Sequence, residues 1–198
     1  MNTTIIINER YCFKYLTNKY DRSQEEKRIG YIFDSFNKKT VLFLSIYRDL
    51  LKVHHRTMCL SEELTNTKTG DKAGLVLVSP ETFQSDFIHT QFGYALLMHE
   101  LGHYLNGDYK YNFVDCEKRR MEALKEGRVL ECELLADEFA VSQCGLNKYI
   151  KAIEWMKFLR EKVLNGYSNE NRDLAMLEFE KRIEHCIEYA KDNRIKLK

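Results

Sequence analysis

The chain of 198 residues has a single proline, six cysteines without a Cys-x-x-Cys pair, and no long hydrophobic run. A zinc ribbon is therefore excluded, and scattered thiols are typical of a reduced protein. The longest apolar stretch, TVLFLSIY from Thr40, is far too short to cross a bilayer. The first residues, MNTTIIINERY, lack the basic and apolar regions of a signal peptide. We therefore expect a cytoplasmic protein without a membrane span.

The chain also lacks an excess of charge of either sign. It has 31 basic and 30 acidic residues, which gives a net charge of +1. Such a balance argues against nucleic acid or an anionic membrane surface as the main partner. The length is sufficient for one domain with its own core. We predict a single domain over residues 1–198, with a helical part at 1–52, a metal-binding core at 53–145 and C-terminal helices at 146–198.

Local patterns predict an α+β fold with a small antiparallel or mixed sheet and mostly helices. SQEE from Ser23 has the form of a capping box, and the apolar residues Ile29, Ile32 and Phe33 follow at helical spacing. The β-branched run GLVLVS predicts a strand, and Pro80 suits the first position of a short helix. In chain order, we predict helices over 23–36 and 40–51, strands over 53–61 and 74–79, and helices over 90–106, 116–144, 146–165 and 169–193.

The segment LLMHELGHYLNGD, from Leu96 to Asp108, contains the main chemical signal. His99 and His103 are four residues apart, so on a helix both imidazoles lie on one face and can bind one metal ion. Glu100 flanks that position, where a carboxylate can act as the general base toward a water molecule. The alternative is an ordinary helix with two surface histidines.

A second pattern, ECELLADEFA from Glu131 to Ala140, supplies further ligands. Glu133 and Asp137 are also four residues apart, and a catalytic zinc site requires a third protein ligand. Glu133 is our candidate for that ligand, and Asp137 for the carboxylate that orients a ligand histidine through its outer nitrogen. The alternative is a solvated acidic helix face.

The pair of motifs, HELGH followed by Glu-x-x-Ala-Asp-x-x-Ala, resembles the gluzincin metallopeptidases. The likeness is greatest to the soluble catalytic core of the HtpX and CAAX-prenyl-protease group, and looser to ImmA/IrrE-like proteases. It covers about residues 53–145 and implies a zincin-like fold, with zinc bound by His99, His103 and Glu133, Glu100 as base and Asp137 behind the ligands. The chain departs from the first group in two respects: it has no membrane span, and no His-Pro precedes Arg182-Ile183.

Further candidates concern the substrate. Tyr167 and Arg182 can hydrogen-bond a tetrahedral intermediate, although core packing or a salt bridge is the simpler role for each. The strand Leu75–Val78 (Leu75, Val76, Leu77 and Val78) is the expected edge to which an extended substrate adds. The remaining histidines, His54, His55, His89 and His185, are assigned structural or surface roles.

The sequence thus predicts a zinc-dependent endopeptidase with one Zn²⁺ per chain and a protein or peptide as substrate. Two rivals stay open: a regulatory protease of the ImmA/IrrE kind that cleaves a repressor, and a non-catalytic zinc-binding protein on the same scaffold. Glu100 discriminates between catalysis and binding, because a structural metal site has no use for a carboxylate at that position.

Overall fold

The computed structural model describes residues 4–16, 24–50, 58–83, 90–110, 113–163 and 169–195. The chain divides into two compact units, one up to Tyr94 and one from Ala95 onward. The first unit carries the strands and the second carries most of the helices, so the fold is α+β as predicted. The boundary lies within helix α3 (Gln91–Asn106). The single domain expected over 1–198 stays a prediction.

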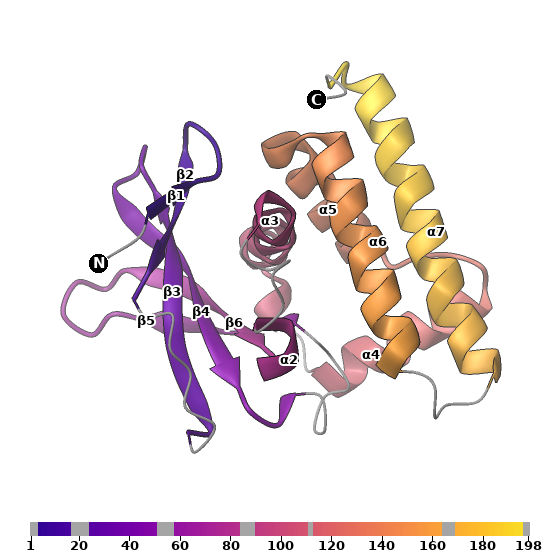
Figure 1. Ribbon diagram of the computed structural model, residues 1–198, viewed down its shortest axis with the longest axis horizontal. Coiled ribbons are helices and arrows are strands. Elements are labelled where there is room, and N and C mark those ends of the chain that lie inside the picture. Colours follow the sequence, from indigo (N-terminus) through magenta and orange to yellow (C-terminus); the bar gives the residue numbers. More distant parts are fainter. Residues whose placement is uncertain are drawn as a thin grey trace. The chain divides into compact units, whose positions relative to one another are not determined.

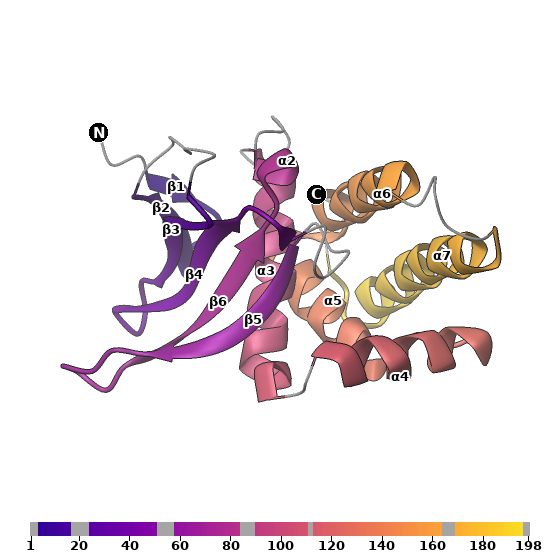
Figure 2. The ribbon, with the colours of Figure 1, turned by 90° about the horizontal axis from the view of Figure 1, so that it is seen from below.

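The first unit is built on a six-stranded mixed sheet with the strand order β1-β2-β3-β4-β6-β5 (Figures 1 and 2). Neighbouring strands in this sheet are antiparallel, except β4 and β6, which run parallel to each other. The short helix α2 (Pro80–Phe83) follows β6 and begins at the proline, as predicted. The strands are β1 (Thr4–Ile6), β2 (Tyr11–Tyr15), β3 (Glu26–Asp34), β4 (Lys39–Tyr47), β5 (Met58–Thr65) and β6 (Lys72–Val78).

The two helices predicted over 23–36 and 40–51 are wrong, because this segment forms the hairpin of β3 and β4. The register shifts between Arg28 and Gly30 and again between Ile32 and Phe33. Such bulges break the alternation of a strand, so the apolar residues fall at a spacing that imitates a helix. The helical part expected at 1–52 is therefore wrong over its described residues, and Ser23 lies outside them.

The edge strand predicted at Leu75–Val78 is also wrong. These residues belong to β6, which is hydrogen-bonded to β4 on one side and to β5 on the other. Ala73 to Val78 are all buried, which is typical of a strand inside a sheet with both faces covered. Among the strands that the structure describes, β1 and β5 are the outer ones. A turn at 66–70 joins β5 to β6.

The second unit consists of helices that follow one another closely. α7 packs against α4, α5 and α6 (Figure 1). The single helix predicted over 116–144 is in fact two, because the chain turns at Gly127, whose φ of 72° suits glycine. After α3 come the 3-10 helix η2 (Asp108–Lys110), α4 (Phe113–Lys125), α5 (Glu131–Cys144), α6 (Leu146–Val163) and α7 (Asn169–Asp192).

The contact between α3 and α5 depends on small residues. A Cβ atom added at Gly102 would lie 3.0 Å from the Cα atom of Ala136. Gly102 stands inside the HELGH motif, and Ala136 stands between Glu133 and Asp137. The two segments that carry the chemical signal are therefore held against each other, backbone to backbone.

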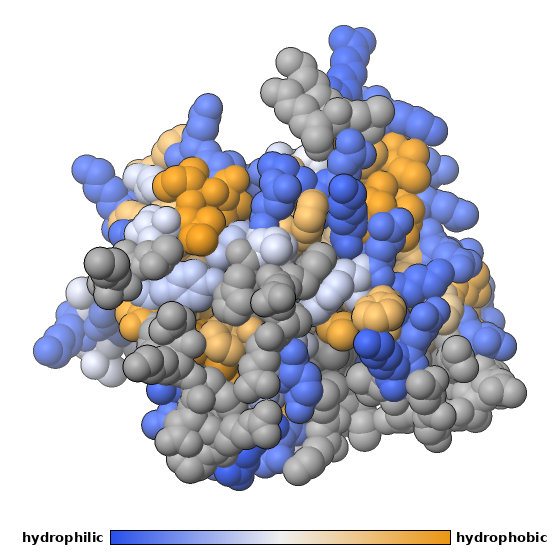
Figure 3. Space-filling view, viewed as in Figure 1, coloured by the Kyte–Doolittle hydropathy of each residue, from blue (hydrophilic) through white to orange (hydrophobic). Residues whose placement is uncertain are grey.

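On the face shown in Figure 3, hydrophilic and hydrophobic residues are interspersed. The large apolar side chains that are at least about a third exposed are scattered along the chain: Ile6, Leu16, Phe36, Leu105, Leu135, Phe158 and Leu177. Within the described ranges, the helices are all too short or too polar to cross a membrane.

Candidate metal centre

Three side chains from two helices meet at one point in the second unit. His99 and His103 come from α3 and Glu133 comes from the first turn of α5. The Nε2 atoms of the two histidines lie 3.0 Å apart, and Oε2 of Glu133 lies 3.4 Å from the first and 3.7 Å from the second. Zinc ligands at about 2.0–2.2 Å in tetrahedral geometry are roughly 3.3 Å from one another. The group can therefore hold a metal ion of this size.

The ring nitrogen of His99 that is not directed at the other two candidate ligands, Nδ1, contacts Asp137 and Tyr149. This atom lies 2.9 Å from Oδ1 of Asp137 and 2.8 Å from the hydroxyl oxygen of Tyr149. Asp137 is fully buried on α5, one turn after Glu133. A carboxylate at this position favours a proton on Nδ1, which leaves Nε2 free to bind a metal. The residue predicted to orient a ligand histidine thus contacts His99.

The outer nitrogen of His103 has its own carboxylate, which sequence reasoning missed. Nδ1 of His103 lies 2.8 Å from Oδ2 of Asp108. Asp108 begins η2 directly after Gly107, whose positive φ ends α3. This turn brings the aspartate back toward the last turn of the helix. The sequence could have predicted this contact, because an acidic residue follows directly after the glycine that ends the helix.

Arg182, the candidate for the oxyanion, makes different contacts. Its guanidinium donates to both oxygens of Asp137, at 2.8 Å from Nε and 2.6 Å from Nη2. Its Nη1 atom also lies 3.1 Å from Oε2 of Glu133. The side chain is 5% exposed. Arg182 therefore serves as the buried counter-charge of the two carboxylates on α5. The other oxyanion candidate, Tyr167, lies outside the described residues.

Burial and these ion pairs shift the protonation of the cluster. Burial by itself would raise the pKa of Glu133 and of Asp137, but the nearby Arg182 guanidinium lowers both below their usual values. Burial would lower the pKa of His103, yet its hydrogen bonds with Asp108 and Glu133 raise it to about 10. Burial raises the pKa of the Tyr149 hydroxyl. In the protein without a metal, the cluster therefore holds carboxylates against two cations.

Glu100 lies on α3 directly after His99 and is 8% exposed. Its negative charge is close enough to contribute to the raised pKa of His103. The candidate base is therefore inside the same buried cluster as the candidate ligands. A carboxylate at this position can accept a proton from a water molecule bound nearby.

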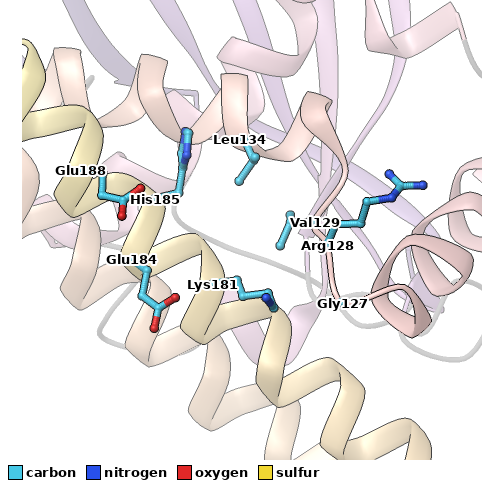
Figure 4. A pocket seen from close by; sticks show the side chains of 8 residues that line it. All are labelled: Gly127, Arg128, Val129, Leu134, Lys181, Glu184, His185 and Glu188. Atoms are coloured by element: carbon cyan, nitrogen blue, oxygen red, sulfur yellow. The ribbon is translucent and has the colours of Figure 1, made fainter.

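The remaining predicted residues are not part of this cluster. His54, His55 and His89 lie outside the described residues. His185 pairs with Glu138 at 2.9 Å and lines a hollow between the loop at 127–129, α5 and α7 (Figure 4). Half of the eight residues that line the hollow are charged, and none of the three candidate ligands lines it. The predicted substrate strand, β6, belongs to the first unit.

Comparison of the chain with protein-family models, curated proteins and solved structures found no match. The resemblance to the gluzincin metallopeptidases therefore rests on the two sequence motifs alone.

Proposed function

We propose that the protein is a zinc-dependent endopeptidase. The observation that carries the proposal is the meeting of His99, His103 and Glu133 at ligand spacing with Glu100 buried beside them. The donor set of two imidazoles and one carboxylate is that of catalytic zinc sites, which keep one position open. The outer nitrogens of both histidines are paired with carboxylates, as is usual for metal-binding imidazoles.

Zinc bound by His99, His103 and Glu133 would supply Lewis acidity and lower the pKa of water at the open position. Asp137 and Asp108 hold the two imidazoles with their Nε2 atoms directed to a common point. Arg182 keeps Glu133 and Asp137 ionised, because it neutralises part of their charge inside the protein. The chain thus keeps Glu133 in the ionised form that a metal requires, whereas His103, whose pKa is raised to about 10, must lose a proton to bind one.

Glu100 provides the proton transfer in this mechanism. Its carboxylate takes a proton from the water that attacks the peptide carbonyl and passes it to the leaving amine. The proton thereby moves from the nucleophile to the leaving group through one side chain. Burial of Glu100 keeps bulk water away from it, which favours transfer to the substrate.

The test compares wild type with Glu100→Gln, which keeps the shape of the side chain but removes the base. N-terminal profiling of cells that express each form reports new protein termini, and so identifies substrates as well as activity. We expect termini that depend on Glu100, and purified Glu100→Gln that retains its zinc while hydrolysis falls at least about a hundredfold. Glu131→Gln, an exposed position on α5, is the matched control and should behave as wild type.

Two outcomes would contradict the proposal. Equal termini from wild type and Glu100→Gln, with zinc present in both, would favour the non-catalytic binding protein. Loss of zinc from Glu100→Gln would make this residue a ligand rather than the base. If the termini come from a single transcriptional repressor, the activity is that of a regulatory protease of the ImmA/IrrE kind.

A further inference from the structure

Tyr149 belongs to α6 and reaches the metal centre from behind. Its side chain is fully buried, and its ring lies nearly parallel to that of His99 with the ring centres 6.0 Å apart. Its hydroxyl oxygen lies 2.8 Å from Nδ1 of His99, and the hydroxyl donates a hydrogen bond to Oδ1 of Asp137. One hydroxyl therefore contacts both the ligand and the carboxylate that pairs with it.

The direction of these hydrogen bonds follows from the charges. A carboxylate is a stronger acceptor than an imidazole, so the Tyr149 proton goes to Asp137. The hydroxyl oxygen then accepts from Nη2 of Arg182, at 3.2 Å, and from the Nδ1–H group of His99. The two groups nearest to Nδ1, the carboxylate and the hydroxyl oxygen, both accept, whereas Nη2 of Arg182 lies farther away, at 3.4 Å. These closer contacts favour a proton on Nδ1, with Nε2 directed at Glu133 and His103.

Asp137 alone does not fix the tautomer and orientation of the His99 imidazole. Its Oδ1 atom accepts from Arg182 at 2.6 Å as well as from Tyr149, while it lies 2.9 Å from His99. An acceptor shared among three donors restrains each of them weakly in direction. The Tyr149 oxygen provides Nδ1–H with a second acceptor and holds the carboxylate in its orientation.

We propose that Tyr149 is a positioning residue of the metal centre, which fixes the tautomer and orientation of His99 both directly and through Asp137. The inference rests on the metal-binding part of the proposed function and does not require that the protein be a peptidase. It adds α6 to the elements that build the site, because the ligands come from α3 and α5 and the counter-charge from α7.

The experiment uses the full chain with Tyr149→Phe, which keeps the ring and removes only the hydroxyl. Zinc affinity is measured by competition with a chromophoric chelator, and the ligand geometry is followed in the visible spectrum of the cobalt-substituted protein. We expect affinity to fall roughly tenfold, as is usual when a residue behind a metal ligand is changed, together with an altered cobalt spectrum. Tyr189→Phe on α7, a half-buried tyrosine, is the matched control and should change neither.

A double-mutant cycle with Asp137→Asn tests whether Tyr149 acts through that carboxylate. If it does, the double variant binds zinc only slightly more weakly than Asp137→Asn alone, because the two residues form one unit. The inference is overturned if Tyr149→Phe binds zinc within about twofold of wild type with an unchanged cobalt spectrum. It is also overturned if wild type binds no zinc. Neither the zinc affinity nor the cobalt spectrum depends on peptidase activity. A protein that binds zinc without cleaving peptides therefore leaves this inference intact.

Discussion

His103 and Asp108 form a contact that joins the end of a helix to the candidate metal centre: Nδ1 of the histidine lies 2.8 Å from Oδ2 of the aspartate. The two residues are separated by the last turn of α3 and by Gly107. His99 has an equivalent partner in Asp137, but that partner comes from α5. Each imidazole therefore has a carboxylate behind it, one supplied locally and one supplied by the tertiary fold.

Asp108→Asn should weaken zinc binding without unfolding the protein. The amide is a poorer acceptor than the carboxylate, so His103 loses basicity and orientation, and affinity falls roughly 10- to 100-fold. Asp115→Asn, an exposed position at the start of α4, is the control. Chelator competition measures both variants. Equal affinities would show that the contact with Asp108 does not support the ligand.

Zinc binding should release a proton and strengthen as the pH rises. In the protein without a metal, the pKa of His103 is raised from 6.5 to about 10, so the imidazole is protonated at neutral pH and must lose a proton to bind zinc. Affinity should increase up to about tenfold per pH unit below that pKa. Calorimetry in two buffers with different ionisation enthalpies counts the proton. Affinity that is independent of pH between about 7 and 9 would contradict this prediction.

The same shift predicts how the stability of the protein without a metal varies with pH. Because the folded pKa of His103 lies above the unfolded value, the stabilisation is complete below pH 6.5 and is lost as the pH rises toward 10. The free energy of unfolding in the presence of a chelator should therefore decline across that interval. His103→Asn, which cannot titrate, should show a smaller decline.

Arg182→Met should make the protein depend on zinc for its stability. The variant leaves Glu133 and Asp137 buried without their cation, which costs about 3–5 kcal/mol. Zinc supplies positive charge at Glu133, so adding it should raise the melting temperature more in the variant than in wild type. Arg120→Met is the matched comparison, because Arg120 forms a buried pair with Glu178 at 2.8 Å between α4 and α7. An equal gain from zinc in wild type and both variants would contradict the counter-charge role.

Asp34→Asn should destabilise the sheet unit and flatten its response to acid. Burial by itself would raise the pKa of Asp34, but hydrogen bonds from Arg10 and from the turn residues Phe36 and Asn37 lower it to about 2. The folded pKa is below the usual aspartate value of 3.8, so this stabilisation is present above pH 3.8 and is lost as the pH falls toward 2.

Urea unfolding at neutral pH should therefore show a loss of about 1–3 kcal/mol for Asp34→Asn. The difference from wild type should shrink below pH 3.8. Asp71→Asn, an exposed aspartate in the turn between β5 and β6, is the control and should change little. A difference that stays constant down to about pH 2 would rule out the ionised carboxylate as the source of the effect.

The sequence was sufficient to predict which residues of α3 and α5 meet, because each motif lies within one helix and its spacing reports a shared face. Glu133 and Asp137 are the clearest example, since both reach the histidines of α3. Tyr149 and the true contacts of Arg182 could not be predicted, because they arise from the packing of α6 and α7 on α5. The role of Asp108 could have been predicted, since this residue lies directly after Gly107, where α3 ends.

The sheet was harder to predict, for a different reason. The bulges in β3 interrupt the alternation of apolar residues, so a strand acquires the spacing of a helix. Strand order depends on pairing over long distances in sequence, and β6 lies between β4 and β5 although β5 precedes it in the chain. A buried run such as Leu75–Val78 has the composition of an interior strand, and that composition was the available signal against an edge.

The close approach of Gly102 to Ala136 also sets how far the candidate ligands of one helix stand from those of the other. A methyl group at residue 102 would lie 3.0 Å from the Cα atom of Ala136, so its neighbours would have to give by a few tenths of an ångström. Oε2 of Glu133 on α5 lies 3.4 and 3.7 Å from the Nε2 atoms of the two histidines on α3. The hydrogen atom that glycine carries in place of a side chain thus allows residues of two separate helices to meet at one point.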